Sequence, residues 1–295
     1  MHRTLSVIKR TLIGFYNDQM THHAAALTYY ALLSLFPAVL LGLSLLGVIG
    51  QYPGTYDSII EYLREVAPDS TLDTIDAALR EALEDKSRAV TGLVISVIVT
   101  FYGTTGVLEA ARRALNIVFE VDGGRSFLAR KSIDIVSSIV LGALVLITMI
   151  LVFVGGGFAE DIFGFIGLGS TAAEIWSYAR WPAALFVALL VFSFIYYVTP
   201  DVEPRGFRWI TPGAIAAVLV WVIASVGFSK YISNFTDVNA TYGSFGAAIV
   251  LIFWLWLTNV AMLFGAELNA EIEREKQLAE GTPMPETLDL EARGS

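Results

Sequence analysis

Six long apolar stretches alternate with polar segments along the chain of 295 residues. Most of them approach or exceed the roughly 20 apolar residues that an α-helix, rising about 1.5 Å per residue, needs to cross about 30 Å of hydrocarbon. We therefore expect an all-α fold, a polytopic membrane protein with six transmembrane helices. The expected spans are residues 24–50, 89–109, 133–158, 181–199, 209–228 and 243–266.

The longest polar insertion lies between the first two stretches, at residues 51–88. Its apolar residues recur at intervals of three and four on either side of Pro68, a pattern typical of short amphipathic helices. We expect a short amphipathic helical cap on the outer side, packed on the ends of the spans, with a partner-binding surface as the alternative. The remaining organisation is expected to be a cytoplasmic amphipathic segment at 1–23, a transmembrane domain at 24–275 and a disordered cytoplasmic tail at 276–295.

Composition also indicates a lipid environment. The chain is 55% hydrophobic and 16% charged, with a mean hydropathy of +0.64, whereas soluble chains carry about 25% charged residues. It contains no cysteine, which excludes disulfides, zinc thiolate sites and iron–sulfur ligation. The net charge of −9 argues against broad binding to nucleic-acid backbones. We expect membrane lipids, and no nucleic acid, as partners.

The basic residues are unevenly distributed between the two sides of the expected bundle. If the amino terminus is cytoplasmic, thirteen of the nineteen Lys and Arg residues fall on inside segments. This bias follows the positive-inside rule, so we expect both termini in the cytoplasm. The inside bases are Arg3, Lys9, Arg10, Arg112, Arg113, Arg125, Arg130, Lys131, Arg205, Arg208, Arg274, Lys276 and Arg293.

Several segments resemble the YihY/BrkB family of bacterial inner-membrane proteins. They are "HAAALTYYALLSLFPAVLLGLSLLG" (23–47), "GVLEAARRALNIVF" (106–119), "YYVTPDVEPRGFRWITPGAIAAVLVW" (196–221) and "GFSKYISNF" (227–235). The resemblance covers roughly residues 15–274 in order and spacing, and it implies a multi-pass protein of the bacterial inner membrane. Members of that family have been linked to virulence, and many carry a ribonuclease BN label that is widely regarded as misassigned. A transport role is the one commonly suggested.

The sequence carries no recognisable catalytic motif. Its only histidines are His2, His22 and His23, and none has a metal-ligand spacing with acidic residues. The chain has no G-x-S-x-G elbow and no glycine-rich phosphate loop. Asp201 and Glu203 flank a short loop next to Pro200, which we interpret as a solvated turn. We therefore expect no enzymatic activity, no metal and no cofactor.

Polar residues collect at the expected inner ends of the spans. Glu109 precedes Arg112 and Arg113 by three and four residues, a spacing that brings opposite charges onto one helix face. This pattern is typical of an ion pair at the membrane interface or of an inward-facing vestibule, in which an arginine balanced by Glu267 receives an anionic substrate. The candidate substrate-binding residues are Tyr29, Tyr30, Glu109, Arg112, Arg113, Asn116, Glu267 and Asn269.

Two features of the spans concern helix shape and packing. Pro37 removes one backbone hydrogen bond within the first span and predicts a kink, which is either structural or part of a substrate pathway. Gly243, Gly246 and Gly265 offer small surfaces for close helix contact in the sixth span.

A bundle with polar inner ends, a kinked first span and no enzyme motif favours a transporter or permease for an anionic or amphiphilic substrate, such as a lipid. The alternative is a non-transporting cell-envelope scaffold or assembly factor, and the remote alternative is a membrane-bound ribonuclease. Residues 56–85 would dock an envelope partner, and a homo-oligomer is equally open. The sequence leaves open the substrate and the coupling ion.

Overall fold

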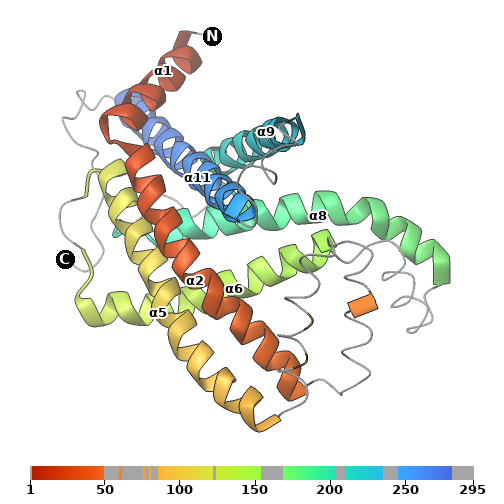
Figure 1. Ribbon diagram of the computed structural model, residues 1–295. Coiled ribbons are helices and arrows are strands. Elements are labelled where there is room, and N and C mark those ends of the chain that lie inside the picture. The colour runs from red at the N-terminus through yellow and green to blue at the C-terminus, as the bar shows by residue number, and fades with distance from the viewer. Residues whose placement is uncertain are drawn as a thin grey trace. The chain divides into compact units, whose positions relative to one another are not determined.

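The computed structural model describes residues 2–49, 60–61, 76, 80, 86–121, 124–153, 169–202, 210–234 and 245–280. These residues form two compact units, one comprising residues 1–30 with 105–295 and the other residues 31–104. The described residues contain seven α-helices (Figure 1), as the hydrophobic pattern predicts. They are α1 (His2–Asn17), α2 (Met20–Ile49), α5 (Lys86–Val118), α6 (Phe127–Phe153), α8 (Gly169–Val198), α9 (Pro212–Asn234) and α11 (Phe245–Ala279).

Each of the six expected spans overlaps one long helix. Five stretches of the described residues are long and apolar enough to cross a membrane, which is consistent with the expected count of six. The remaining expected span, 24–50, lies in α2, where Pro37 stands inside the helix. The five stretches are Val90–Val118, Phe127–Thr148, Thr171–Val198, Pro212–Ile232 and Ala248–Ala279.

Several helices run farther than their apolar segments. α5 continues past residue 109 to Val118, and α11 continues past residue 266 to Ala279. Hydropathy falls where a helix leaves lipid, but the backbone hydrogen bonds of a helix continue as long as its residues allow. Residues 276–279, expected in the disordered tail, are therefore helical. Residues 281–295 lie outside the described part, as does the expected cap at 56–85 apart from residues 60, 61, 76 and 80.

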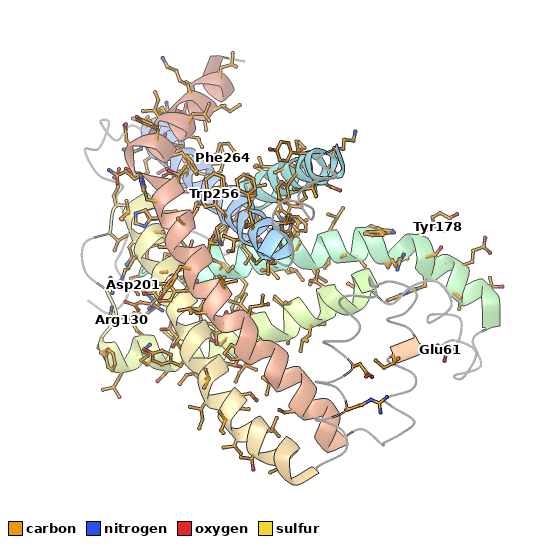
Figure 2. The ribbon with its side chains drawn as sticks, in the orientation of Figure 1. Glu61, Arg130, Tyr178, Asp201, Trp256 and Phe264 are labelled. Carbon is orange, nitrogen blue, oxygen red and sulfur yellow. The ribbon has the colours of Figure 1, made fainter. Side chains whose placement is uncertain are left out.

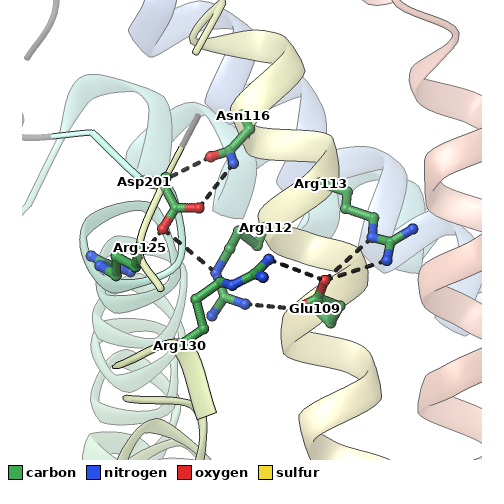
Figure 3. A pocket seen from close by; sticks show the side chains of 8 residues that line it. Glu109, Arg112, Arg113, Asn116, Arg125, Arg130 and Asp201 are labelled. Atoms are coloured by element: carbon green, nitrogen blue, oxygen red, sulfur yellow. Dashed lines mark hydrogen bonds and ion pairs between the residues drawn. The ribbon is translucent and has the colours of Figure 1, made fainter. Parts of the chain in front are cut away.

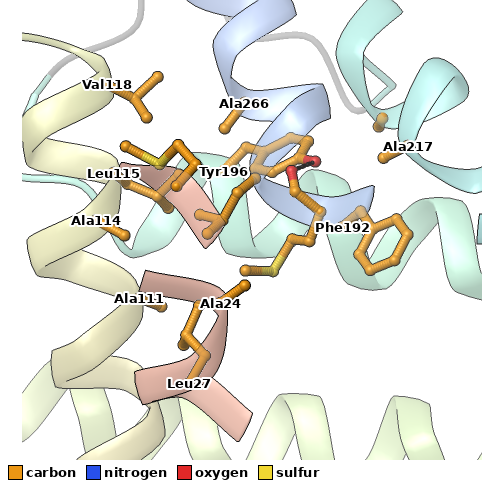
Figure 4. Packing of buried hydrophobic residues seen from close by; sticks show 14 of the residues in the cluster. Ala24, Leu27, Ala111, Ala114, Leu115, Val118, Phe192, Tyr196, Ala217 and Ala266 are labelled. Carbon is orange, nitrogen blue, oxygen red and sulfur yellow. Dashed lines mark hydrogen bonds between the residues drawn. The ribbon is translucent and has the colours of Figure 1, made fainter. Parts of the chain in front are cut away.

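The larger unit has a core of small and medium apolar side chains from α2, α5, α8, α9 and α11 (Figure 4). α11 packs along α9, α1 packs on α11, and α8 contacts both α6 and α9. Small side chains allow helix backbones to approach closely in a membrane protein. The buried core consists of Met20, Ala24, Leu27, Ala111, Ala114, Leu115, Val118, Phe192, Tyr196, Ala214, Ala217, Val218, Met262, Leu263, Ala266 and Ala270.

Glycines mark a close contact between α9 and α11 in this unit. A Cβ atom on Gly265 of α11 would overlap the Gly213 carbonyl and the Tyr196 hydroxyl. Tyr196 donates a hydrogen bond to the Met262 carbonyl of α11. Gly246 is also buried, while Gly243 lies outside the described residues. The α9–α11 contact therefore depends on the absence of a side chain at residue 265.

The smaller unit contains the second half of α2 and the first half of α5. A Cβ atom on Gly103 would lie 3.0 Å from the Ser34 Cα, and one on Gly92 would lie 2.9 Å from the Ser44 Oγ. Glycine therefore permits close contact between the two helices here as well.

Large apolar side chains line the exposed faces of several helices. On α9 they recur every three or four residues, which places them on one helix face. In water such stripes would be unfavourable, whereas in a bilayer they contact lipid chains of similar polarity. Exposed members include Ile215, Leu219, Ile223 and Val226 of α9, and Ile135, Val136 and Ile139 of α6.

Candidate functional site

A polar cavity of about 380 Å³ lies beside the carboxyl-terminal half of α5 (Figure 3). Four of its lining residues are arginines and two are carboxylates. In Figure 2, Asp201 and Arg130 lie near one another beside α5, while Trp256 and Phe264 belong to α11. We call this cavity the arginine pocket. Its lining residues are Glu109, Arg112, Arg113, Asn116, Gly124, Arg125, Arg130 and Asp201.

α5 supplies one wall of the arginine pocket. Its polar residues at 109, 112, 113 and 116 recur at intervals of three and four residues, so they share one face of the helix. Arg112 donates to Glu109 at 2.8 Å, and Arg113 donates to the same carboxylate at 3.4 Å. The opposite face of this helix carries the alanines and leucines of the core. The amphipathic pattern of α5 therefore separates the pocket from the apolar interior.

The end of α5 turns the chain back over the pocket. Glu120 has a φ of 55°, its amide donates to the Ile117 carbonyl, and the Val121 amide donates to the Asn116 carbonyl. These two bonds form a Schellman motif, which satisfies carbonyls that the helix end leaves unpaired. The chain then passes Gly124, where a Cβ atom would overlap the Asp201 carboxylate.

Asp201 reaches the pocket from the end of α8, where Pro200 limits continuation of the helix. Its carboxylate accepts a hydrogen bond from Asn116 Nδ2 at 3.1 Å, and its backbone amide donates to Asn116 Oδ1 at 2.9 Å. Arg125 lies 3.4 Å from this carboxylate and also donates to the Val198 carbonyl. Asp201 is buried, so its interpretation as a solvated turn residue is wrong. Glu203, its expected companion, lies outside the described residues.

The innermost pair of the site joins α5 to α6. Arg112 forms an ion pair with Asp134, and both side chains are almost fully buried. The Arg112 Nε atom lies 3.9 Å from Asp201 Oδ1. Because an uncompensated buried charge is very unfavourable, these carboxylates are needed to hold Arg112 in place. Arg112 is thus balanced by Asp134 and Asp201, and not by Glu267 as expected from the sequence.

The accessible side of the pocket has a weaker set of pairs. Arg113 is 75% exposed and Arg130 is 34% exposed, and both approach Glu109, at 3.4 Å and 3.8 Å. Exposed ion pairs of this kind contribute only about 0–1 kcal/mol, so they exchange partners readily. The pocket therefore combines a fixed inner pair of cations, Arg112 and Arg125, with two outer cations that can rearrange.

The predicted vestibule residues do not all meet. Glu109, Arg112, Arg113 and Asn116 line the pocket together. The other four candidates, Tyr29, Tyr30, Glu267 and Asn269, do not line it. Tyr29 and Tyr30 are 60% and 38% exposed, and their rings make an edge-to-face contact with each other at 5.4 Å.

Glu267 and Asn269 of α11 contact different neighbouring helices, α1 and the start of α9. Asn269 Oδ1 accepts a hydrogen bond from the Gly213 amide at 2.8 Å, and Asn269 Nδ2 donates to Thr211 Oγ1 at 3.0 Å. Asn269 therefore provides a hydrogen-bond acceptor for the Gly213 amide at the start of α9, which has no acceptor within that helix. Glu267 is buried next to Gly14 of α1.

Sequence reasoning missed Arg125, Arg130 and Gly124 as pocket residues and Asp134 as the ion-pair partner of Arg112. Asp134 carried a usable signal, since it is the one charged residue within the expected span 133–158. Ionisable residues within spans are costly and tend to have a specific partner. Gly124 and Arg125 belong to a short connection whose path is set by tertiary contacts, and Arg130 lies in the first turn of α6. Among the residues that the structure describes, no three His, Asp or Glu side chains are grouped so as to hold a metal ion.

Comparison with known proteins finds one matching family model and several bacterial relatives. The family described as "Virulence factor BrkB" matches residues 11–289. The ribonuclease-like protein YfkH of Bacillus subtilis is 29% identical over 279 residues, which cover 95% of this chain and 99% of YfkH. A UPF0761 membrane protein of Idiomarina loihiensis is 26% identical over 287 residues, covering 96% of this chain and 95% of the relative.

Other relatives are longer than this chain. A UPF0761 membrane protein of Nitrosospira multiformis is 25% identical over 277 residues, which cover 92% of this chain but 61% of that protein. No solved structure matches the sequence. Since the family match spans nearly the whole chain, and its helices are long and apolar, the protein is an integral membrane protein that belongs to the virulence factor BrkB family.

Proposed function

We propose that this protein is a permease that moves an anionic amphiphile, such as an anionic lipid, across a bacterial inner membrane, with both termini in the cytoplasm. The observation that carries the proposal is the composition of the arginine pocket. Four arginines face two lining carboxylates, and the buried Asp134 pairs with Arg112, which still leaves an excess of one formal positive charge. A cavity of this charge favours an anionic group over a cation or a neutral molecule.

The outer arginines are the groups that would bind the anionic head. Among the described residues of the pocket, Arg113 and Arg130 pair with Glu109, at distances longer than those of a strong charge-assisted hydrogen bond. The guanidinium group presents donors in a planar fork that matches carboxylate and phosphate oxygens. An incoming phosphate would replace Glu109 as their partner. Arg112 and Arg125 would remain bound to buried carboxylates and keep the pocket in shape.

The apolar part of the substrate has a surface next to the pocket. Arg130 lies in the first turn of α6, with exposed apolar residues before it at Phe127 and Leu128 and after it from Ile135 onward. Arg130 and Ile135 are five residues apart, which corresponds to about 7.5 Å along the helix. The head and the acyl chain of one lipid can span this distance. The head would therefore bind to the arginines while the chain stays against α6.

Reconstituted vesicles test this proposal. The probe is phosphatidylglycerol carrying a fluorescent group, and dithionite added outside removes only the fluorescence that reaches the outer leaflet. We expect faster and more complete loss of fluorescence with the protein than in protein-free vesicles. Replacing both Arg113 and Arg130 by Ala should slow lipid movement about tenfold or more at low probe concentration, since each charged contact contributes about 1.5–3 kcal/mol.

The matched control is Lys276→Ala, which removes an exposed cation of α11 that pairs with Glu273 away from the pocket. This control should move lipid at the wild-type rate. Wild-type protein that moves the probe no faster than empty vesicles would refute the permease. A double arginine variant as fast as wild type would refute the role of the pocket.

One alternative follows from the same pocket. Arginines also bind phosphodiesters, and the relative YfkH is named a ribonuclease-like protein. The purified wild type and the Arg113→Ala, Arg130→Ala double variant should therefore be incubated with RNA in parallel. RNA cleavage by wild type that the double variant lacks, without any lipid movement, would replace the permease by a nuclease.

A further inference from the structure

Two carboxyl groups meet where α1 turns into α2. Asp18 stands in this turn, and Gln19 beside it adopts a φ of 53°. The turn is tied to the end of α1, since the Asp18 amide donates to the Gly14 carbonyl at 2.8 Å. The Asp18 side chain lies beside the side chain of Glu267, which belongs to α11.

Packing of α1 against α11 brings these groups together. Arg10 forms ion pairs with Glu271 at 2.6 Å and with Glu275 at 2.8 Å. Phe15 makes an edge contact with Phe264 at 6.3 Å between ring centroids. A Cβ atom on Gly14 would lie 3.0 Å from Glu267 Oε2, so glycine allows the carboxyl group to lie against α1.

Glu267 is buried without a compensating cation. Its residue is only 3% exposed, and its Oε1 atom has no hydrogen-bond partner among the described residues. The nearby arginines are engaged elsewhere, because Arg10 pairs with Glu271 and Glu275, and Arg274 pairs with Glu120 at 2.6 Å. No ion pair joins Glu267 to a cation within the described part of the chain. An ionised carboxylate in such a place is strongly disfavoured.

Charged groups of both signs surround the two carboxyl groups. Glu120 near the end of α5 disfavours ionisation of Asp18, whereas His23 of α2 and Arg274 of α11 favour it. Glu271 of α11 is an acidic neighbour of Glu267. Arg10 of α1 lies next to Glu271. Burial raises the pKa of Asp18 from its ordinary value, and Glu120 raises it further, against the opposing effects of Glu267, His23 and Arg274.

The hydrogen-bonding capacity of carboxyl groups determines the protonation state of the Asp18–Glu267 pair. Ionised carboxylates only accept hydrogen bonds, so two of them cannot bond to each other. A proton on either one supplies the missing donor and removes the repulsion between like charges. We propose that Asp18 and Glu267 form a proton-binding site in which two carboxyl groups share one proton and thereby link the α1–α2 turn to α11.

Infrared spectroscopy of the purified full-length protein in nanodiscs tests this site without any substrate, so its result does not depend on the proposed function. A protonated carboxyl group has a carbonyl stretch that an ionised group lacks. We expect wild type to show such a band at neutral pH and to lose it as the pH is raised. Glu267→Gln should abolish the band at neutral pH, since Asp18 is then left with a neutral partner.

Two further variants complete the test. Glu273→Gln, which removes a carboxylate that is paired with Lys276 at 2.7 Å, should leave the band unchanged. Asp18→Asn should shift the band, because the hydrogen-bond partner of Glu267 changes; this variant serves if Glu267→Gln fails to fold. A wild type without the band, or a band that neither substitution alters, would overturn the proposal. Sodium ions that raise the melting temperature of wild type but not of Glu267→Gln, with no band present, would show a metal-cation site instead.

Discussion

Arg112 of α5 and Asp134 of α6 form an ion pair whose side chains are only 2% and 1% exposed. Burial removes both charges from water, and their mutual attraction offsets that cost only while both are present. Glu109 and Asp201 provide Arg112 with further acidic neighbours. The pair therefore fixes the geometry of the arginine pocket more than it adds to the net stability of the protein.

Removing one charge of this pair should destabilise the protein more than removing both charges. Asp134→Ala leaves Arg112 buried without its main partner, and we expect the free energy of unfolding in detergent to fall by about 3–5 kcal/mol. The double variant Arg112→Met, Asp134→Leu removes both charges and should recover most of that loss. Denaturant titrations followed by tryptophan fluorescence measure both changes. A double variant as unstable as Asp134→Ala would contradict this account.

The sequence predicts the helices well and their ends poorly. Apolar runs report where the chain prefers lipid, so each of the six expected spans overlaps a long helix. They carry no information about where a helix stops in the polar region. The continuation of α11 to Ala279 depends on charged contacts, such as Arg10 with Glu271 and Glu275, that join residues distant in sequence.

The candidate site was predictable only where it is local. Glu109, Arg112, Arg113 and Asn116 lie on one helix, and their spacing alone places them together. Asp201 comes from the end of α8, and its sequence surroundings of Pro and acidic residues are typical of an exposed turn. Its burial results from reciprocal hydrogen bonds to Asn116, a tertiary contact that has no signature in sequence spacing.

Gly265 permits the close approach of α9 and α11. In Gly265→Ala the new methyl group would overlap the Gly213 carbonyl and the Tyr196 hydroxyl. We expect a loss of about 1–3 kcal/mol from overpacking. Gly227→Ala in α9 is the matched control, since a Cβ atom there meets nothing within 4 Å, and it should raise stability by up to about 1 kcal/mol through helix propensity. Thermal unfolding in detergent measures both, and equal effects would refute the packing role of Gly265.

Asp18 makes stability depend on pH. Its pKa is raised in the folded protein above the ordinary value of 3.8, chiefly by burial. The folded state therefore holds a proton that the unfolded state has already released, so the free energy of unfolding falls as the pH rises from 3.8 through the raised pKa. Asp18→Asn should flatten this slope and leave the protein more stable than wild type at the upper end of the range. Denaturant midpoints across pH measure the slope; Glu273→Gln should keep it, and an unchanged slope in Asp18→Asn would contradict the prediction.

The absence of a side chain at Gly124 leaves room for the Asp201 carboxylate in the wall of the arginine pocket. In Gly124→Ala the methyl group would overlap the Asp201 carboxylate, which must then move away from Asn116 and Arg125. We expect a loss of about 1–3 kcal/mol in stability together with slower movement of labelled phosphatidylglycerol. Gly142→Ala is the matched control, because a Cβ atom there has open space around it, and it should change neither property adversely. A displaced Asp201 alters the charge that Arg112 and Arg125 present to the cavity, so lipid movement should change if this side of the pocket binds substrate. A stability loss without any change in lipid movement would therefore support the contact between Gly124 and Asp201 but exclude this side of the pocket from substrate binding.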